Sequence, residues 1–434
     1  MAGPRSVADW LQWQESLHPH AIDMGLDRVH EVLERLALPV PTGRIVTVGG
    51  TNGKGSTITL LHDCLRAAGG NPGLYTSPHL VHYNERIQIT GRPVTDQALV
   101  TAFARVEAAR GSVPLTYFEF GTLAALVTFA DAGCDDWLLE VGLGGRLDAV
   151  NALDAHIALI TTIGLDHQEW LGDSIELIAA EKAGIMRSGR LALYGDTPVP
   201  LAIRAHAERV GARLMTYASD FSYSRDGADG SWEWAGPGQG HQGVQRLTGL
   251  RAPAHWTAAQ FRNATLVLAA LADMLPAVRL NAAFLNPVLL RSCPPGRFQI
   301  VQREHEWILD VAHNPQAAAV LQAQLSTRPA LTGGPADVTV VVALLTDKAI
   351  TEFVAAIRPA VGRWILAGVD DPRASSESRM RAALGAAGIG TATWAPTPAA
   401  AFETARQVTP PGVRIVVCGS FRIVAPALQW LGLY

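Results

Sequence analysis

Two patterns of apolar residues alternate along this chain. Short continuous runs rich in valine, isoleucine and leucine occur early as RIVTV, DDWLLEV and HIALITTI, and again late as WILDV, VTVVVALL, RWILAGV and VRIVVCG. Stretches with helical spacing separate these runs. Strands that are apolar on both faces are typical of parallel sheets covered by helices. The pattern therefore predicts an α/β fold in which a mostly parallel sheet occurs twice.

Residues 219–250 interrupt this alternation. The segment is rich in glycine and turn pairs with short aromatic alternation, which predicts a small β excursion of antiparallel hairpins that faces solvent. The helical stretch TAAQFRNATLVLAALADML follows, and the prolines of LNPVLLRSCPPGRF then suit a hinge. Because 434 residues exceed what one hydrophobic core usually supports, we expect two domains, residues 1–290 and 291–434.

Charge and cysteine content narrow the classes of function. The net charge is -4, with acids and bases mixed along the chain, so we expect no nucleic-acid partner and no membrane partner. The four cysteines form no CxxC pair, which argues against a thiolate metal site and against a disulfide scaffold. The longest apolar stretch, FGTLAALVTFA, is too short to span a bilayer. These features favour small-molecule chemistry in the cytoplasm.

Lysine is rare in this chain. Of 35 basic residues only Lys54, Lys182 and Lys348 are lysines, so arginine serves wherever a general surface cation is needed. Arginine is a rigid fork, whereas lysine is a compact charge and a potential nucleophilic amine. The positions that keep lysine are therefore candidates for chemistry that arginine does not perform.

The first apolar run leads into the loop GGTNGKGST. The loop is one residue shorter than a Walker motif, and Gly55 stands between Lys54 and Ser56. Its glycines would still let backbone N–H groups converge on phosphate oxygens, at the positive end of the following helix, ITLLHDCLRAAG. The alternative is a plain turn between a strand and a helix with an exposed lysine. We favour a phosphate-binding loop.

Polar side chains follow the next apolar runs, where the carboxyl ends of parallel strands meet. Ser77 lies in LYTSPHL, Glu140 in LLEVGLGGRLD and His167 in TTIGLDHQEW. A hydroxyl, a carboxylate and an imidazole beside a phosphate loop form a plausible shell for Mg²⁺, the ion that accompanies nucleotide phosphates. Singly, each side chain is equally consistent with solvation or helix capping, so the prediction depends on their convergence with the loop.

Lys182 lies in SIELIAAEKAGIM. Helical spacing places Ile175, Ile178, Ala179 and Lys182 on one face. An ammonium beside an apolar stripe must reach solvent, pair with an acid such as Glu181, or change its chemistry. Taken alone, the segment favours a lysine that reaches solvent.

Several segments together resemble a known family. GTNGKGST, SPHLVHYNERI, LEVGLGGRLDAVN, LDHQEWLG, EKAGI, PGRFQIV and DVAHNP resemble the folylpolyglutamate synthase family of the Mur ligase superfamily. DMGLDRV and LTYFEFGTLAAL resemble the bacterial members that also act as dihydrofolate synthases. The motifs extend from about residue 17 to CGSF at 418–421. The resemblance implies an N-terminal P-loop ATPase domain and a C-terminal Rossmann-like domain that caps ATP and binds glutamate.

The resemblance also implies roles for residues at matching positions. Those implied for ATP are Thr51, Asn52, Gly53, Lys54, Gly55, Ser56, Asn263, Arg297 and Asp310. Those implied for the magnesium ions are Ser77, Glu140 and His167. Those implied for the pterin are Ile22, Asp23, Met24, Thr116, Tyr117, Phe118, Glu119 and Asp148. Lys182 matches a lysine that carries a carbamate in the family, and with Lys54 and His313 it forms the implied catalytic set.

Phe118 has two interpretations. A flat aromatic ring suits a pterin, which offers a face for stacking and edges for hydrogen bonds. By pattern alone, Phe118 is equally consistent with a buried core position.

The implied reaction joins a carboxylate to the amine of L-glutamate. ATP would convert the carboxylate of dihydropteroate or of a reduced folate into an acyl phosphate, which glutamate attacks, with Mg²⁺ and Lys54 neutralising charge. A peptidoglycan-type Mur ligase is the nearer alternative, and the pterin-like segments argue against it. A P-loop switch protein is the other, and such a protein would not need the amino acid. We expect a monomer.

Overall fold

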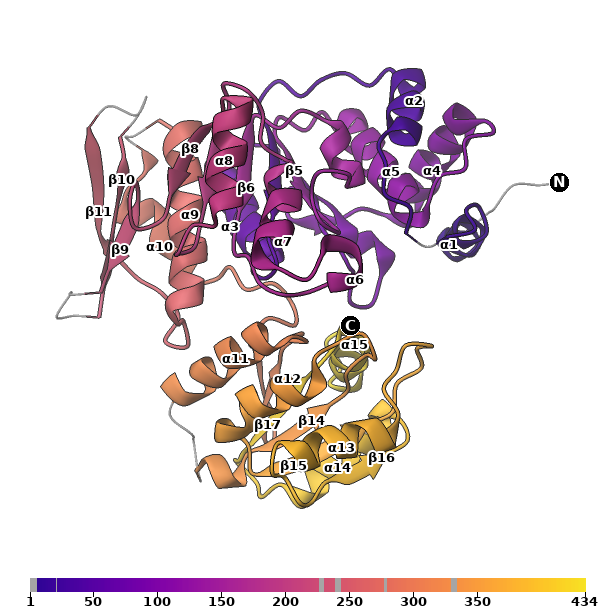
Figure 1. Ribbon diagram of the computed structural model, residues 1–434, viewed down its shortest axis with the longest axis vertical. Coiled ribbons are helices and arrows are strands. Elements are labelled where there is room, and N and C mark those ends of the chain that lie inside the picture. The colour runs from indigo at the N-terminus through magenta and orange to yellow at the C-terminus, as the bar shows by residue number, and fades with distance from the viewer. Residues whose placement is uncertain (1–5, 21, 226–229, 239–242, 277–278, 329–333) are drawn as a thin grey trace. The chain divides into compact units, whose positions relative to one another are not determined.

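The structure of the protein is a computed structural model, which describes residues 6–20, 22–225, 230–238, 243–276, 279–328 and 334–434. Two compact units are present (Figure 1). The first comprises Met1–Ala252 and Phe261–Ser292, and the second Pro253–Gln260 and Cys293–Tyr434.

The first unit contains an eight-stranded sheet in the order β4-β3-β2-β5-β1-β6-β7-β8. Its strands are β1 Ile45–Gly49, β2 Gly73–Tyr75, β3 Ile87–Ile89, β4 Arg92–Pro93, β5 Trp137–Glu140, β6 Ile157–Ile160, β7 Leu191–Tyr194 and β8 Arg213–Thr216. All neighbours from β2 to β8 are parallel, and β3 and β4 add an antiparallel edge. The carboxyl ends of β2, β5, β1 and β6 therefore meet at one edge, in that order.

Helices accompany the strands of the first unit. They are α1 Val7–Glu15, α2 Asp27–Leu36, α3 Lys54–Ala67, α4 Asp96–Arg110, α5 Tyr117–Asp131, α6 Gln168–Leu171, α7 Ile175–Ala183, α8 Leu201–Val210, α9 Ala258–Met274 and α10 Ala282–Leu289, with the short 3₁₀ turns η1 Tyr83–Arg86 and η2 Ala149–Ala152. Every residue of β1, β5, β6 and β7 is buried, on both faces of the sheet. This accounts for the continuous apolar runs in the sequence.

The segment between residues 219 and 250 forms the expected antiparallel hairpins, apart from the parts that lie outside the described residues. The strands are β9 Ser222–Ser224, β10 Trp232–Pro237 and β11 Val244–Leu250. The expectation that this segment faces solvent is wrong for one side. Trp232 and Trp234 are buried, and Trp232 packs edge-on against Phe261 of α9 at 5.4 Å between ring centroids. Burial of two tryptophans fixes the hairpins to the helix.

The second unit contains a six-stranded sheet in the order β12-β13-β17-β14-β15-β16. Its elements are β12 Gln299–Gln302, β13 Glu306–Leu309, α11 Pro315–Thr327, β14 Thr339–Val342, α12 Ile350–Ile357, β15 Arg363–Ala367, α13 Glu377–Ala386, β16 Thr393–Ala395, α14 Pro398–Val408, β17 Arg414–Cys418 and α15 Phe421–Trp430. Only β12 is antiparallel to its neighbour. The predicted fold class, two α/β domains with mostly parallel sheets, is confirmed.

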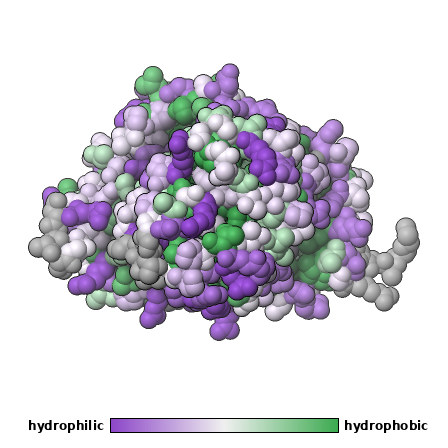
Figure 2. Space-filling model, turned by 90° about the horizontal axis from the view of Figure 1, so that it is seen from below, coloured by the Kyte–Doolittle hydropathy of each residue, from purple (hydrophilic) through white to green (hydrophobic). Residues whose placement is uncertain are grey.

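Hydrophilic residues cover most of the face shown in Figure 2, with small hydrophobic patches between them. Within the described ranges, no helix has both the length and the apolar character that a membrane crossing requires.

Candidate active site

The loop after β1 is shaped by two glycines. Gly50 has φ +139°, and a Cβ there would lie 1.9 Å from Thr161 Oγ1. Gly53 has φ +87°, and a Cβ there would lie 2.8 Å from the amide nitrogen of Asn263. Only glycine fits either position. The helix then starts at Lys54, four residues before the predicted ITLLHDCLRAAG segment, so its N-terminal N–H groups belong to the loop.

The loop is held to the end of β6. Thr51 N–H donates to the Thr162 carbonyl at 2.8 Å, and Thr51 Oγ1 donates to the Gly164 carbonyl at 3.1 Å. Asn52 N–H donates to Thr162 Oγ1 at 3.2 Å. A plain flexible turn would not need these contacts. Ser56 and Gly55 follow in the first turn of α3.

Two lysines meet at one carbonyl of this loop. Lys54 Nζ and Lys182 Nζ each donate to the Gly50 carbonyl at 3.0 Å. Lys182 is 5% exposed. Burial, helped by the neighbouring Lys54 charge, lowers the pKa of Lys182 to about 7. Near neutral pH this amine is therefore partly unprotonated and able to react.

The surroundings of Lys182 differ from two expectations. Ile178 and Ala179 share its buried face, but Ile175 is 39% exposed, because it occupies the first turn of α7 next to the Ser174 cap. Lys182 is too buried to reach solvent along its stem, which excludes that interpretation. Glu181 is not its partner either. The Glu181 carboxylate accepts from Arg146 at 2.9 Å instead.

The predicted metal ligands lie at the same edge of the sheet. Glu140, the last residue of β5, is buried, and its Oε2 accepts from Ser77 N–H at 3.2 Å, just beyond β2. His167 follows β6 with a left-handed backbone, φ +52°, and is exposed. No group of three His, Cys, Asp or Glu side chains in the described residues is arranged to hold a metal ion.

This arrangement fits Mg²⁺ bound mainly through phosphate and water. A buried carboxylate and a serine hydroxyl are hard oxygen ligands, and Mg²⁺ in nucleotide sites takes only one or two protein carboxylates. The structure joins Ser77 to Glu140 directly, while β6 places His167 at the same edge. Ligation by these three residues stays a prediction.

The predicted pterin segment begins α5. Thr116 caps the helix, and Glu119 Oε2 accepts from Thr116 N–H at 2.7 Å. Arg28 of α2 donates to Glu119 Oε1 at 2.9 Å and to Asp23 Oδ2 at 2.9 Å. Glu119 therefore has both oxygens engaged within the protein. Asp23 is 39% exposed at its side chain, so it is the more available carboxylate of the two.

Phe118, in the first turn of α5, packs against the loop that follows β5. A Cβ on Gly142 would be 2.7 Å from Phe118 Cζ, so the ring approaches the backbone there. Tyr75 lies 6.0 Å away between ring centroids. Phe118 is half-buried, which differs from the fully buried core residues Phe120 and Phe129 of the same helix. This partial exposure favours a stacking surface over a plain core position.

Two other predicted pterin residues, Met24 and Asp148, lie at the same loop. Met24 approaches Gly144, and its Cε would lie 3.4 Å from a Cβ there. Tyr117 is half-buried and Ile22 is 39% exposed. Asp148 is buried, and burial raises its pKa to about 6 although backbone N–H groups donate to it. Its Oδ2 accepts from Leu143 N–H at 2.8 Å, so Asp148 holds the loop in shape.

The second unit carries the remaining predicted residues. Asp310, just after β13, is buried and accepts from Phe298 N–H at 2.7 Å and from Ala312 N–H at 2.8 Å. Burial raises the pKa of Asp310, and the nearby Arg297 opposes this shift. Arg297 lies over the Phe421 ring at 5.2 Å.

His313 completes this group at the carboxyl end of β13. Its Nδ1 lies 2.9 Å from the Val311 carbonyl, so that nitrogen carries a proton and donates to the carbonyl. His313, Asp310 and Arg297 thus belong to the same corner of the second sheet, beside Asn314, which caps α11.

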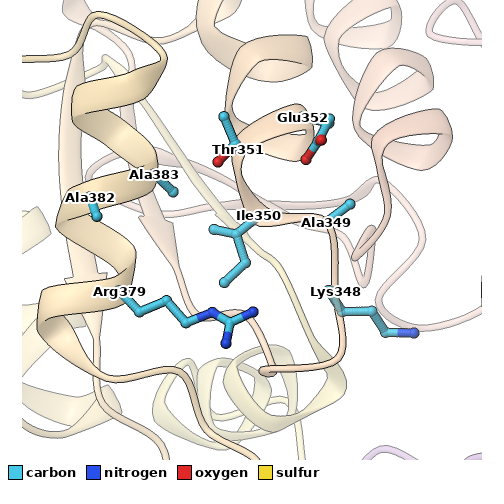
Figure 3. A pocket seen from close by; sticks show the side chains of 8 residues that line it. All are labelled: Lys348, Ala349, Ile350, Thr351, Glu352, Arg379, Ala382 and Ala383. Carbon is cyan, nitrogen blue, oxygen red and sulfur yellow. The ribbon is translucent and has the colours of Figure 1, made fainter.

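The second unit also has a hollow of about 410 Å³ near the start of α12. Figure 3 shows Arg379 pointing toward Ile350, while the Lys348 side chain leads away. Lys348 is paired with Asp347 at 3.3 Å. The hollow is lined by Lys348, Ala349, Ile350, Thr351, Glu352, Arg379, Ala382 and Ala383. Lys348, the third lysine, therefore lies at a hollow whose lining includes none of the predicted site residues of the second unit.

Sequence reasoning missed two arginines of the first unit. Arg28 joins Asp23 to Glu119, and Arg86 lies between Tyr83 and Tyr117. In the sequence both belong to quoted motifs, DMGLDRV and SPHLVHYNERI, but arginine is so common in this chain that neither stood out.

Family models match both units. The Mur ligase middle domain matches residues 48–228, and the Mur ligase glutamate ligase domain matches residues 296–421. A dihydrofolate synthase/folylpolyglutamate synthase of Escherichia coli (strain K12) is 38% identical over 423 residues, covering 98% of this chain and 95% of that protein. A protein of the same name from Bacillus subtilis (strain 168) is 32% identical, covering 85% of this chain and 86% of that protein.

Solved structures agree in fold along the whole chain. The bifunctional folylpolyglutamate synthase/dihydrofolate synthase of Yersinia pestis, complexed with AMPPNP and Mn ion, has a TM-score of 0.89 and 38% identity, covering 99% of this chain and 100% of that one. FolC of Escherichia coli in complex with DHPP and ADP has a TM-score of 0.88 and 36% identity, covering 99% of this chain and 98% of that one.

Proposed function

The chain belongs to the dihydrofolate synthase/folylpolyglutamate synthase family of the Mur ligases, and we propose that the site at the carboxyl edge of the first sheet carries out its chemistry. The enzyme is an ATP-dependent ligase. It adds L-glutamate to dihydropteroate, forming dihydrofolate, and extends reduced folates by further glutamates. The relatives support this function over a peptidoglycan ligase and over a P-loop switch protein.

The shape of the loop at residues 50–53 carries the assignment of the ATP site. Gly50 and Gly53 have backbone conformations that exclude other residues, and Lys54 begins the helix behind them. N–H groups and an ammonium therefore converge where phosphate oxygens would bind. Asn263, against Gly53, would contact the nucleotide, and bound Mg²⁺ would supply positive charge to its phosphates.

The reaction proceeds in two steps. An oxygen of the acceptor carboxylate bonds to the γ-phosphorus of ATP, the bond between that phosphorus and the β,γ-bridging oxygen breaks, and ADP leaves. The glutamate nitrogen then attacks the carbonyl carbon and loses a proton, and phosphate departs. Lys54 stabilises charge in the first step, and Phe118 and Asp23 orient the pterin. No covalent bond to a side chain is needed.

The second domain would complete the site. We assign residues 1–290 to ATP and the pterin, and residues 291–434 to capping ATP and binding glutamate. Arg297, Asp310 and His313 share one corner of the second sheet, which is consistent with a single ligand that contacts all three. Excluding water would protect the acyl phosphate from hydrolysis.

ADP release measured with and without L-glutamate tests the function. We expect release to depend on glutamate and on dihydropteroate, and to occur also with tetrahydrofolate as acceptor. Release that ignores glutamate would indicate a switch protein, and acceptance of a nucleotide-linked muramoyl substrate would indicate a peptidoglycan ligase. Size-exclusion chromatography would test the monomer that we expect.

A further inference from the structure

Arg86 is a buried cation without a counter-ion. It is 9% exposed, and no described carboxylate lies within ion-pair distance of it. Its Nε donates to His79 Nδ1 at 2.9 Å, which is its one side-chain hydrogen bond among the described residues. A charge this buried is costly unless an anion meets it.

The groups around Arg86 do not supply a negative charge. Its Cζ lies 5.2 Å from the Tyr83 ring centroid and 5.7 Å from that of Tyr117. Burial raises the pKa of both phenols, so both stay neutral at physiological pH. His79 accepts at Nδ1 and is therefore neutral in this arrangement. The rings hold the guanidinium in place by cation–π contact and leave its charge uncompensated.

Arg86 stands between the two halves of the proposed site. Thr76 N–H donates to the Arg86 carbonyl at 2.9 Å, which fixes Arg86 beside Ser77 and, through Ser77, beside Glu140. On its other side is Tyr117, which opens the pterin segment of α5. A ligand that binds at this segment and reaches toward the phosphate loop would pass Arg86.

We propose that Arg86 binds the carboxylate of dihydropteroate that is to be activated. This inference rests on the proposed function and names a substrate-binding residue for it. A guanidinium offers two parallel N–H donors that match a carboxylate, which orients the acceptor oxygen for transfer. A phosphate of ATP is the other candidate anion, but Lys54 and the loop glycines already serve the phosphates, while Arg86 adjoins the pterin segment.

The test compares dihydropteroate with its methyl ester, which lacks the charge. Binding of each is measured by titration calorimetry to the full-length enzyme in the presence of a non-hydrolysable ATP analogue. We expect the wild type to bind the acid roughly 10- to 100-fold more tightly than the ester. Equal binding of acid and ester by the wild type would overturn the proposal without any variant.

Variants of Arg86 then test whether this residue causes the difference in affinity between the acid and the ester. In Arg86→Met, acid binding should fall to the level of the ester, and ester binding should change by less than about 3-fold. Arg86→Lys, which keeps the charge but not the fork, should be intermediate. Equal losses for acid and ester would indicate a purely structural role, and a raised KM for ATP with unchanged acid binding would indicate a phosphate contact. Either outcome contradicts the proposal.

The exposed Arg105, paired with Asp131, provides the matched control. Arg105→Met should leave both affinities unchanged. Thermal unfolding of each variant checks that it is folded. These binding results are independent of turnover, so a wild type without glutamate-dependent ADP release would overturn the proposed function and leave the Arg86 measurement interpretable.

Discussion

The Gly50 carbonyl is where two ammonium groups meet, 3.0 Å from each. Two cations at one neutral acceptor repel each other, and the pKa of Lys182 is lowered by burial and by Lys54. A phosphate or a change in the chemistry of Lys182 would relieve this repulsion. The two lysines are thus suited to different tasks: one as a charge, the other as a reactive amine.

Lys54→Ala should abolish ligation and leave the fold intact, because this lysine contacts loop carbonyls and adds little packing. Lys54→Arg should also fail, since a planar fork does not occupy a site shaped for a point charge. Glutamate-dependent ADP release and thermal unfolding measure the two effects. Near-normal ligation by either variant would falsify the phosphate-binding role.

Lys182 should carry a carbamate. Its Nζ would attack CO₂ and lose a proton, giving an anionic oxygen ligand near Glu140. Only the free amine reacts, so activation by bicarbonate should rise with pH through about 7, the pKa to which burial lowers this lysine. Below that pH the ammonium is unreactive. Density beyond Nζ in a crystal structure would show the adduct.

A variant gives a second measurement of the same site. Lys182→Ala should lose activity, and acetate should restore part of it by replacing the missing carboxylate. A fully active alanine variant, together with a bare amine in an active crystal form, would contradict the carbamate.

Phe118→Ala should raise the KM for dihydropteroate roughly 10-fold through loss of stacking, while the KM for ATP changes less than about 2-fold. Phe129→Leu, a buried residue on the same helix, is the control and should lower thermal stability without this selective effect. Steady-state kinetics with each substrate varied in turn would decide. Parallel changes in both constants would mean that Phe118 does not contact the pterin.

At the scale of elements, Arg28 joins α2 to α5. Its guanidinium donates to the buried Glu119, whose other oxygen caps α5. Removing the arginine leaves a buried carboxylate without its partner, which is more costly than replacing the pair. The same arginine holds Asp23, so the position of the pterin segment depends on this contact.

Arg28→Met should therefore lower the free energy of unfolding by about 1–3 kcal/mol, a range that allows for the partial exposure of Arg28. The free energy of unfolding of the double variant with Glu119→Gln should fall by less than the sum of the two single losses, since the buried carboxylate that Arg28 neutralises is then also absent. Urea denaturation measures all three. Strict additivity would show that the two side chains do not interact.

At the scale of the whole molecule, each unit has a core of its own. One hydrophobic cluster includes Phe120, Leu139 and Ile178 of the first unit, and another includes Ile308, Phe353 and Val416 of the second. Two separate cores allow two cooperative unfolding transitions. A ligand that contacts both units would couple them.

AMPPNP with Mg²⁺ should raise the midpoint temperatures of both unfolding transitions of the full-length protein, measured by calorimetry. At a free concentration of about 100 times its Kd, a ligand that binds only the native state adds about 2.7 kcal/mol of stability. Asp310→Ala should reduce the shift of the second transition, because the second unit would lose one of its three proposed contacts with the nucleotide. A nucleotide that never shifts the second transition would contradict the capping role of residues 291–434.

The sequence alone determined the fold class and the shape of the loop, because both depend on local patterns. Continuous apolar runs such as IVTVG are buried on both faces, as parallel strands require. The spacing of GGTNGKGST likewise required a glycine-shaped turn before a helix. The runs also placed Ser77 and Glu140 at one edge, since parallel strands end on the same side.

Only the tertiary structure decided which side chains far apart in the sequence contact one another and how deeply each charge is buried. The spacing on α7 predicted that Ile175 is buried and that Lys182 reaches solvent. In the folded protein Ile175 is exposed and Lys182 is buried. The Gly50 carbonyl that accepts from Lys182 lies 132 residues away in the sequence. In the sequence Arg86 is one arginine among many, and only the fold shows that it is buried against two tyrosine rings. Burial sets the cost of a charge, and burial is a property of the folded chain and not of any segment.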